Sequence, residues 1–220
     1  MRMTVKRRKI SILKIVIITI SVIVSAIAGG LLFHRFYYTS IYVDGQSMYP
    51  TLNQNGTRDR APERVEYGIV DTHFNIDQIR RFDIVATYYP EDYNEDGDLL
   101  MTAVLKIKRV MVLPNETFRF TLGGDLYVNN NLILQDFYPP EFRDYIKDTA
   151  KTSFKNRTLG ADEFWVMGDN RGHSRDSQSE ETPIVFSSFF GVLKAIEGTC
   201  TLDNTQGTCT NRRLENIRFF

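Results

Sequence analysis

Cysteine is nearly absent from this sequence: of 220 residues, only Cys200 and Cys209 are cysteines. Both lie near the C-terminus and are separated by a polar loop that contains glycine. A disulfide between them is allowed outside the membrane, and two free thiols on a frayed tail are the alternative. A loop this short would add roughly 2–3 kcal/mol of stability at most in the chain-entropy model. A disulfide between the two cysteines would therefore stabilise only the segment around it.

The chain also lacks internal repeats, low-complexity segments and any long amphipathic helix outside one apolar run near the N-terminus. Its net charge is zero, from 27 basic and 27 acidic residues, but the charges are unevenly placed. Residues 1–14 hold six cations and no acid, so the other 21 cations stand against all 27 acidic residues. This balance excludes nucleic-acid binding by the main part of the chain. The length and the 42% hydrophobic content suit one domain, or one domain with a small lobe.

One long hydrophobic run is present, at residues 15–33, and it carries no charge over 19 residues. A helix of that length spans roughly 28 Å, close to a hydrocarbon core of about 30 Å. Because the basic segment 1–14 precedes it, we expect a cytoplasmic N-terminus and an extracytoplasmic domain over residues 34–220. The alternative is a cleavable signal peptide, since Ala-Ile-Ala at 26–28 is a small-x-small site. Because the apolar run continues beyond that site, we predict an uncleaved anchor.

Alternating and β-branched segments predict that the rest of the chain is mainly β. Residues 82–89 and 101–113 form one expected hairpin around an acidic turn, and residues 126–134 form a second around three asparagines. Residues 164–167 are a further expected strand, and the apolar stretch 185–196 returns to the core or lies near the membrane. Residues 58–78 are polar and weakly periodic, so we expect an insertion between strands there.

Three motifs follow one another along the chain. Val-Asp-Gly-Gln-Ser-Met-Tyr-Pro-Thr-Leu at 43–52 places Ser47 at the end of an expected strand, on a loop constrained by Pro50. Lys-Ile-Lys-Arg-Val at 106–110 is followed by Leu-Pro at 113 and 114. Gly-Asp-Asn-Arg-Gly-His-Ser-Arg-Asp-Ser fills 168–177. Taken alone, Ser47 is equally well explained as a turn serine.

In this order the three motifs resemble those of the bacterial type I signal peptidases, which are membrane-anchored Ser/Lys proteases that remove signal peptides. The resemblance runs from the N-terminal anchor to about residue 192. It implies a signal-peptidase-like β-fold of antiparallel sheets, preceded by one N-terminal transmembrane helix. It also implies a serine endopeptidase that cleaves exported preproteins after small-x-small sites, on the outer face of the cell membrane, without a metal or other cofactor.

The resemblance assigns Ser47 as the nucleophile and Lys108 as its general base. A serine hydroxyl needs a base, and lysine can serve only when it is neutral. The reference pKa of lysine is about 10.4, and burial lowers it by disfavouring the ammonium. Alternation places Lys106 and Lys108 on one face of the strand, and the pattern alone would leave both in solvent. The spacing to Arg-Val and Leu-Pro matches the family's base at Lys108.

The third motif supplies supporting residues in the family. Its serine hydrogen-bonds the lysine amine, and its charged residues pair to hold the loop; the positions here are Ser174, Asp169, Arg171 and Asp176. Gln178 stands where the family often has an arginine, which puts an ion pair with Asp176 in question. Gly45 stands where some members add a serine hydroxyl to the oxyanion hole. The Ser47 N–H is thus the expected oxyanion donor.

Some features of the sequence allow other interpretations. His173 is read as a loop residue, because lysine occupies the position where a Ser-His variant of the family has histidine. The acidic turn beginning at Asp92 matches half of a calcium loop, but Ala103 stands where a bidentate glutamate is required. The remaining alternatives are a self-cleaving Ser/Lys repressor-type protease and a non-enzymatic anchored β-domain. The expected partners are signal peptides and the lipid bilayer, and we expect a monomer that binds no nucleic acid.

Overall fold

The computed structural model describes residues 12–140, 142, 143, 156–203 and 207–220. The chain divides into two compact units between Tyr38 and Thr39. The first contains α1 (Ile12–Tyr37), none of whose side chains is buried, and which is long and apolar enough to cross a membrane. The predicted helix over residues 15–33 is confirmed and is longer at both ends. Of the basic segment predicted at 1–14, residues 1–11 lie outside the described residues.

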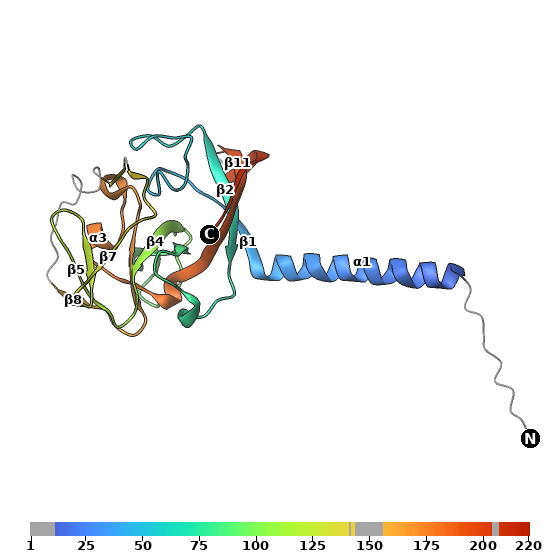
Figure 1. The fold of residues 1–220 in the computed structure, drawn as a ribbon, viewed down its shortest axis with the longest axis horizontal. Coiled ribbons are helices and arrows are strands. Elements are labelled where there is room, and N and C mark those ends of the chain that lie inside the picture. The colour runs from blue at the N-terminus through green and yellow to red at the C-terminus, as the bar shows by residue number, and fades with distance from the viewer. Residues whose placement is uncertain (1–11, 141, 144–155, 204–206) are drawn as a thin grey trace, which may run out of the picture. The chain divides into compact units, whose positions relative to one another are not determined.

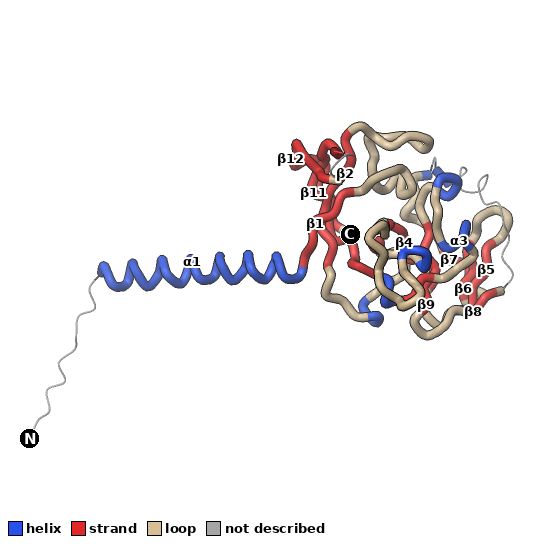
Figure 2. Tube along the Cα trace, turned by 180° about the vertical axis from the view of Figure 1, so that it is seen from behind, coloured by secondary structure: helices blue, strands red, loops and turns tan. Residues whose placement is uncertain are grey.

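The second unit contains two mainly antiparallel β-sheets (Figures 1 and 2). Within the described residues the larger sheet has eight strands in the order β1-β2-β11-β3-β4-β9-β10, with β12 paired to β11. The strands of this sheet are β1 (Tyr38–Tyr42), β2 (Arg64–Asp71), β3 (Ile84–Thr87), β4 (Lys106–Val112), β9 (Glu163–Met167), β10 (Ile184–Val185), β11 (Phe189–Asp203) and β12 (Thr208–Phe219).

The smaller sheet has the order β7-β6-β5-β8 and lies away from β1 and β2 (Figure 1). Its strands are β5 (Thr117–Phe120), β6 (Leu126–Val128), β7 (Asn131–Ile133) and β8 (Arg157–Thr158). Asn129 and Asn130 join β6 to β7 with φ of 48° and 66°, the left-handed conformation that a tight hairpin turn requires. The predicted hairpin at 126–134 is therefore confirmed.

Short helical turns complete the second unit. These are α3 (Ser177–Glu180) and the 3-10 helices at Ile76–Gln78, Pro90–Asp92, Arg171–His173 and Phe186–Ser188. Asp176 is the N-cap of α3, and its carboxylate accepts the backbone N–H groups of Gln178 and Ser179. Such capping satisfies amide groups that the helix itself cannot.

The strand predictions hold except in one segment. β3 and β4 pair as the predicted hairpin, although β4 begins only at Lys106. Residues 58–78 are not an insertion between strands, because they contain β2, which pairs with β11. The stretch at 185–196 returns to the core, where Leu193 and Ile196 are buried. The C-terminus is not a frayed tail, since β12 pairs with β11 and a disulfide joins Cys200 to Cys209.

Candidate active site

Ser47 lies on the loop that follows β1, and its neighbours anchor that loop in the core. Met48 and Leu52 are buried and pack with Val43 and Ile107 in one hydrophobic cluster. These contacts remove apolar surface from water on the core side of the loop and leave Ser47 half-buried at its rim. The loop is thus held in place by its apolar residues, while the serine stays accessible.

The amine of Lys108 lies beside this serine, on the strand β4. Its Nζ is 3.1 Å from Ser47 Oγ and 2.9 Å from the carbonyl oxygen of Ile107, to which it donates. Lys108 is only 4% exposed, and burial lowers its pKa to about 8, against opposing effects of the Asp176 and Asp169 carboxylates. The structure therefore brings the two predicted catalytic residues within hydrogen-bond distance, with an amine that is easily deprotonated.

Lys106, the other lysine on this face, has a different environment. Its Nζ donates to Asp92 Oδ2 at 2.8 Å and lies 4.6 Å from the centre of the Tyr89 ring. The same carboxylate accepts the backbone N–H groups of Tyr89 and Val104. Lys106 is thus paired with an acid, whereas Lys108 contacts no carboxylate among the described residues. Asp92, the first residue of the sequence that resembles half of a calcium loop, therefore uses its carboxylate to pair with Lys106.

Gly168 brings the third motif against the loop of the candidate nucleophile Ser47 (the nucleophile loop, residues 43–52). A methyl group at this position would lie 2.2 Å from Ser174 Oγ and 2.5 Å from the Ser47 carbonyl oxygen, so no side chain fits. Asn170 reinforces the contact, because its N–H donates to the same Ser47 carbonyl at 3.0 Å. Ser174 Oγ is buried and has no hydrogen-bond partner among the described residues, so the predicted bond from Ser174 to Lys108 is not formed in this structure.

Asp169 pairs with a residue that the sequence did not single out as functional. Arg109 Nε and Nη2 donate to its two carboxylate oxygens at 2.8 and 2.6 Å, and both side chains are buried. The guanidinium also donates to the Phe82 carbonyl and to Thr51 Oγ1. Arg109 directly follows Lys108 in the chain, so this ion pair ties β4 to the third motif. Only its place in the Lys-Arg-Val motif could have indicated this role.

Arg171 and Asp176 also hold the loop, but not by pairing with each other or with Asp169. Arg171 Nε donates to the Tyr138 hydroxyl at 2.8 Å, and its Nη2 donates to Gln135 Oε1 at 3.0 Å. Asp176 accepts the Gly168 N–H at 2.8 Å in addition to capping α3. Of the three charged residues expected to pair and hold the loop, Asp169 does so, with Arg109. Arg171 and Asp176 instead hold it through hydrogen bonds to uncharged groups.

A cleft of about 690 Å³ opens beside the two catalytic candidates. It is lined by β1 with the residues that follow it and by residues 103–108. Ile41, Leu105 and Phe190 give the cleft apolar surface near Ser47. Among the described residues, β1 is the edge strand of the larger sheet, next to β2. Its other edge is therefore free to pair with an added strand.

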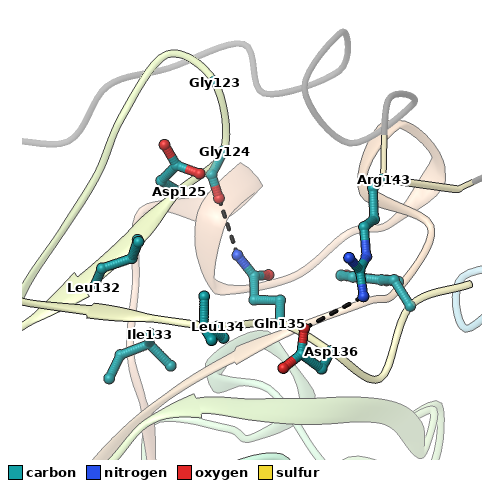
Figure 3. A pocket seen from close by; sticks show the side chains of 10 residues that line it. Gly123, Gly124, Asp125, Leu132, Ile133, Leu134, Gln135, Asp136 and Arg143 are labelled. Atoms are coloured by element: carbon teal, nitrogen blue, oxygen red, sulfur yellow. Dashed lines mark hydrogen bonds and ion pairs between the residues drawn. The ribbon is translucent and has the colours of Figure 1, made fainter. Parts of the chain in front are cut away.

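A second, smaller cavity of about 160 Å³ lies at the small sheet (Figure 3). Gln135 Nε2 donates there to the Gly124 carbonyl at 3.1 Å, and Arg143 pairs with Asp136 at 3.3 Å. Its lining contains neither Ser47 nor Lys108. His173 is likewise engaged elsewhere, with its Nε2 3.2 Å from Asp59 Oδ1. The 690 Å³ cleft is thus the candidate active site.

A serine hydroxyl lies within hydrogen-bond distance of a buried lysine amine, beside a cleft in a β-domain, and the family match identifies the chain as a peptidase. The chain belongs to the signal peptidase family, peptidase S26, whose model matches residues 13–198. Two cyanobacterial relatives are a signal peptidase I from Leptolyngbya laminosa, 34% identical over 62% of this chain and 57% of that protein, and a probable signal peptidase I-1 from Synechocystis sp., 31% identical over 72% and 70%.

A third relative, a signal peptidase I from Bacillus amyloliquefaciens, is 30% identical over 79% of this chain and 81% of that protein. A solved signal peptidase I from Enterococcus faecalis V583 covers 53% of this chain and 97% of that one, with 25% identity and a TM-score of 0.42. The family match stops at residue 198, so most of the pairing between β11 and β12 lies beyond it.

Proposed function

We propose that this chain is a membrane-anchored serine endopeptidase that cleaves signal peptides from exported preproteins, with Ser47 as nucleophile and Lys108 as general base. The observation that carries the proposal is the distance of 3.1 Å between Lys108 Nζ and Ser47 Oγ, with the amine buried. Membership of the signal peptidase family supports the substrate class. The apolar helix α1 supports the anchor.

In the first step, neutral Lys108 accepts the hydroxyl proton while Ser47 Oγ bonds to the carbonyl carbon of the scissile peptide. The resulting oxyanion needs preorganised donors. The Ser47 N–H makes no hydrogen bond within the described residues and is the proposed donor. Lys108, now an ammonium, gives the proton to the leaving nitrogen as the C–N bond breaks, and the mature protein departs.

In the second step, neutral Lys108 takes a proton from water, whose oxygen attacks the acyl-enzyme carbonyl. Collapse of this intermediate breaks the bond to Ser47 Oγ, which recovers the proton from Lys108. The Ile107 carbonyl accepts one N–H of the amine throughout and helps to point the nitrogen at the serine. Ser174 as a further orienting residue stays a prediction, as do the supporting roles of Asp169, Arg171 and Asp176 in catalysis.

The substrate is proposed to bind as an extended strand in the cleft between β1 and residues 103–108. A free strand edge offers main-chain hydrogen bonds to any sequence, and alternate side chains then enter pockets along the strand. Ile41 and Leu105 both line the cleft and supply apolar surface for such pockets. Small side chains at the two specificity positions fit this mode of binding.

The test is cleavage of one preprotein by the purified full-length chain in detergent. We expect Ser47→Ala and Lys108→Met each to abolish cleavage, and the double variant to be no worse than either, because the two residues act as one unit. Lys106→Ala, which removes the neighbouring ammonium, should keep most of the activity. Full activity in Lys108→Met would exclude the dyad.

Three further readouts on the same proteins, namely self-cleavage, partner binding and reaction with a serine-directed inhibitor, separate the two rival functions. A self-cleaving protease of the repressor type would cut its own chain and leave the preprotein intact. An anchored binding domain would bind a partner with Ser47→Ala as well as with the wild type, and would react with no serine-directed inhibitor.

A further inference from the structure

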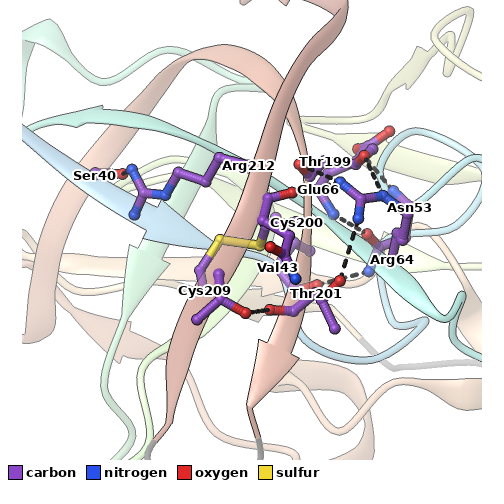
Figure 4. The surroundings of a disulfide bond; sticks show 12 residues. Ser40, Val43, Asn53, Arg64, Glu66, Thr199, Cys200, Thr201, Cys209 and Arg212 are labelled. Atoms are coloured by element: carbon purple, nitrogen blue, oxygen red, sulfur yellow. Dashed lines mark hydrogen bonds between the residues drawn. A yellow bond between two sulfur atoms is a disulfide. The ribbon is translucent and has the colours of Figure 1, made fainter.

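Asn53 directly follows the nucleophile loop and ties its two ends together (Figure 4). Its side-chain amide donates to the carbonyl oxygens of Val43 and Gly45, each at 2.7 Å. Asn53 is 1% exposed and has φ of 56°, a left-handed conformation that asparagine and glycine adopt more readily than other residues. The buried Asn53 side chain, which follows the loop, therefore fixes residues 43–45, which precede Ser47.

Glu66 on β2 determines how this amide is oriented. The Glu66 N–H donates to Asn53 Oδ1 at 2.8 Å, so the NH2 group of the amide must face the loop. The Glu66 carboxylate accepts the Asn53 N–H at 2.8 Å, and its main-chain carbonyl accepts the Val43 N–H at 2.8 Å. Glu66 is itself only 2% exposed, so its charge needs a partner inside the fold.

Arg218 on β12 provides that partner. Its Nη2 donates to Glu66 Oε2 at 2.6 Å, while its Nε and Nη1 are buried without a hydrogen-bond partner among the described residues. Residue 218 lies beyond the family match, which ends at 198, in a hairpin that the Cys200–Cys209 disulfide closes. A segment of this chain that the family model does not reach thus completes the network behind the nucleophile.

We infer that Asn53 is a positioning residue for Ser47, and that Arg218 acts through Glu66 to hold it. The inference rests on the proposed function, since Ser47 is taken as the nucleophile. A loop displaced by about 1 Å would leave Ser47 Oγ outside reach of Lys108 Nζ, a misplacement that costs about 100-fold in rate. The Asn170 N–H still donates to the Ser47 carbonyl, so the loss should be partial.

The experiment compares three full-length variants with the wild type. Asn53→Gly keeps the left-handed backbone and removes the amide, Arg218→Met keeps the apolar stem and removes the charge, and Arg213→Met is the matched control on the exposed side of β12. We expect kcat for a preprotein to fall about ten-fold or more in Asn53→Gly and less in Arg218→Met, with KM within about two-fold of the wild type. Amide hydrogen exchange of residues 43–52 should accelerate in both, and Arg213→Met should behave as the wild type.

The readouts distinguish positioning from a general loss of structure. Each assay is run well below the melting temperature of its variant, so a purely structural role would leave kcat per folded molecule unchanged. An Asn53→Gly variant with wild-type kcat and wild-type exchange at residues 43–52 would overturn the inference. If the wild type cleaves no preprotein, the proposed function fails, and the exchange rates still decide whether Asn53 and Arg218 hold the loop.

Discussion

Lys108 carries its amine into the protein interior, and this environment predicts how catalysis depends on pH. Burial lowers the pKa of Lys108 to about 8, and only the neutral amine can accept the Ser47 proton. The rate of preprotein cleavage should therefore rise with pH and reach half of its maximum near pH 8. The measurement is kcat/KM across the pH range in which the wild type stays folded. A profile still climbing near pH 10 would mean that Lys108 is solvated, close to its reference pKa of about 10.4.

The same burial costs the fold stability, and Lys108→Met should recover it. Below pH 8 the lysine is protonated in both states, and the folded protein holds a buried ammonium. Between about 8 and the ordinary value of 10.5 the unfolded chain binds more protons, so wild-type stability rises with pH across this window. We expect Lys108→Met to raise the free energy of unfolding by about 1–3 kcal/mol at pH 7, and by less as the pH approaches 10.

Urea denaturation at pH 7 and pH 10 measures this difference. The matched control is Lys106→Met, which removes an ammonium paired with Asp92 and should bring no gain. A Lys108→Met variant no more stable than the wild type at pH 7, or a gain independent of pH, would contradict the buried-ammonium account.

Single residues show where prediction from sequence stops. Ser47 and Lys108 were predicted because their motifs resemble those of the signal peptidases, and the structure brings the two side chains together. The partners of Asp169 and Glu66 were not predicted, because each pairs with an arginine distant in sequence, Arg109 and Arg218. Periodicity reports which face of a strand is buried, but it carries no information about which charges meet across the fold.

At the scale of elements, the loop after β9 and the nucleophile loop meet at Gly168, and their fit is close. Gly168→Ala would place a methyl group within 2.5 Å of the Ser47 carbonyl oxygen, so one of the loops must move. We expect kcat to fall about ten-fold or more, because the serine shifts relative to Lys108. The free energy of unfolding should fall by about 1–3 kcal/mol, as for overpacking in a core.

Gly123→Ala is the matched control for this substitution. Its new methyl group would come no closer than 3.8 Å to Thr121 Oγ1, in the small sheet away from the cleft. It should leave both kcat and the free energy of unfolding near the wild-type values. Equal effects of the two substitutions on kcat would show that close packing at Gly168 does not position the serine.

The strands themselves were predictable only where one face is buried. β6 and β7 were found because short apolar runs flank a turn of asparagines. β2 was missed because residues 65–68 are all buried, so the alternation that marks a half-exposed strand is lost. Gly68 explains part of this packing, since a methyl group there would lie 2.0 Å from the Ala195 carbonyl on β11. The close contact between β2 and β11 produces no alternation of apolar and polar residues from which either strand could be predicted.

At the scale of the whole molecule, the charge distribution should fix the orientation in the membrane. Six cations and no acid precede or begin the apolar helix, whereas the rest of the chain has more acids than cations. Positively charged flanks stay on the cytoplasmic side, so we expect the catalytic unit, residues 39–220, outside the cell membrane. Protease added to intact protoplasts should digest this unit, and the N-terminal basic segment should be protected until the cells are lysed.

The same preparation tests whether the helix is an anchor or is removed. Because the apolar run continues past residue 28, the mature chain should keep its first residues and remain in the membrane after a carbonate wash. Ala28→Leu is the matched variant, since it removes the small residue that cleavage after Ala-Ile-Ala would require. Wild type and variant should have the same N-terminus and the same mass. A wild-type chain beginning at Gly29, together with an uncut variant, would show that α1 is a cleaved leader and that the catalytic unit acts without this anchor.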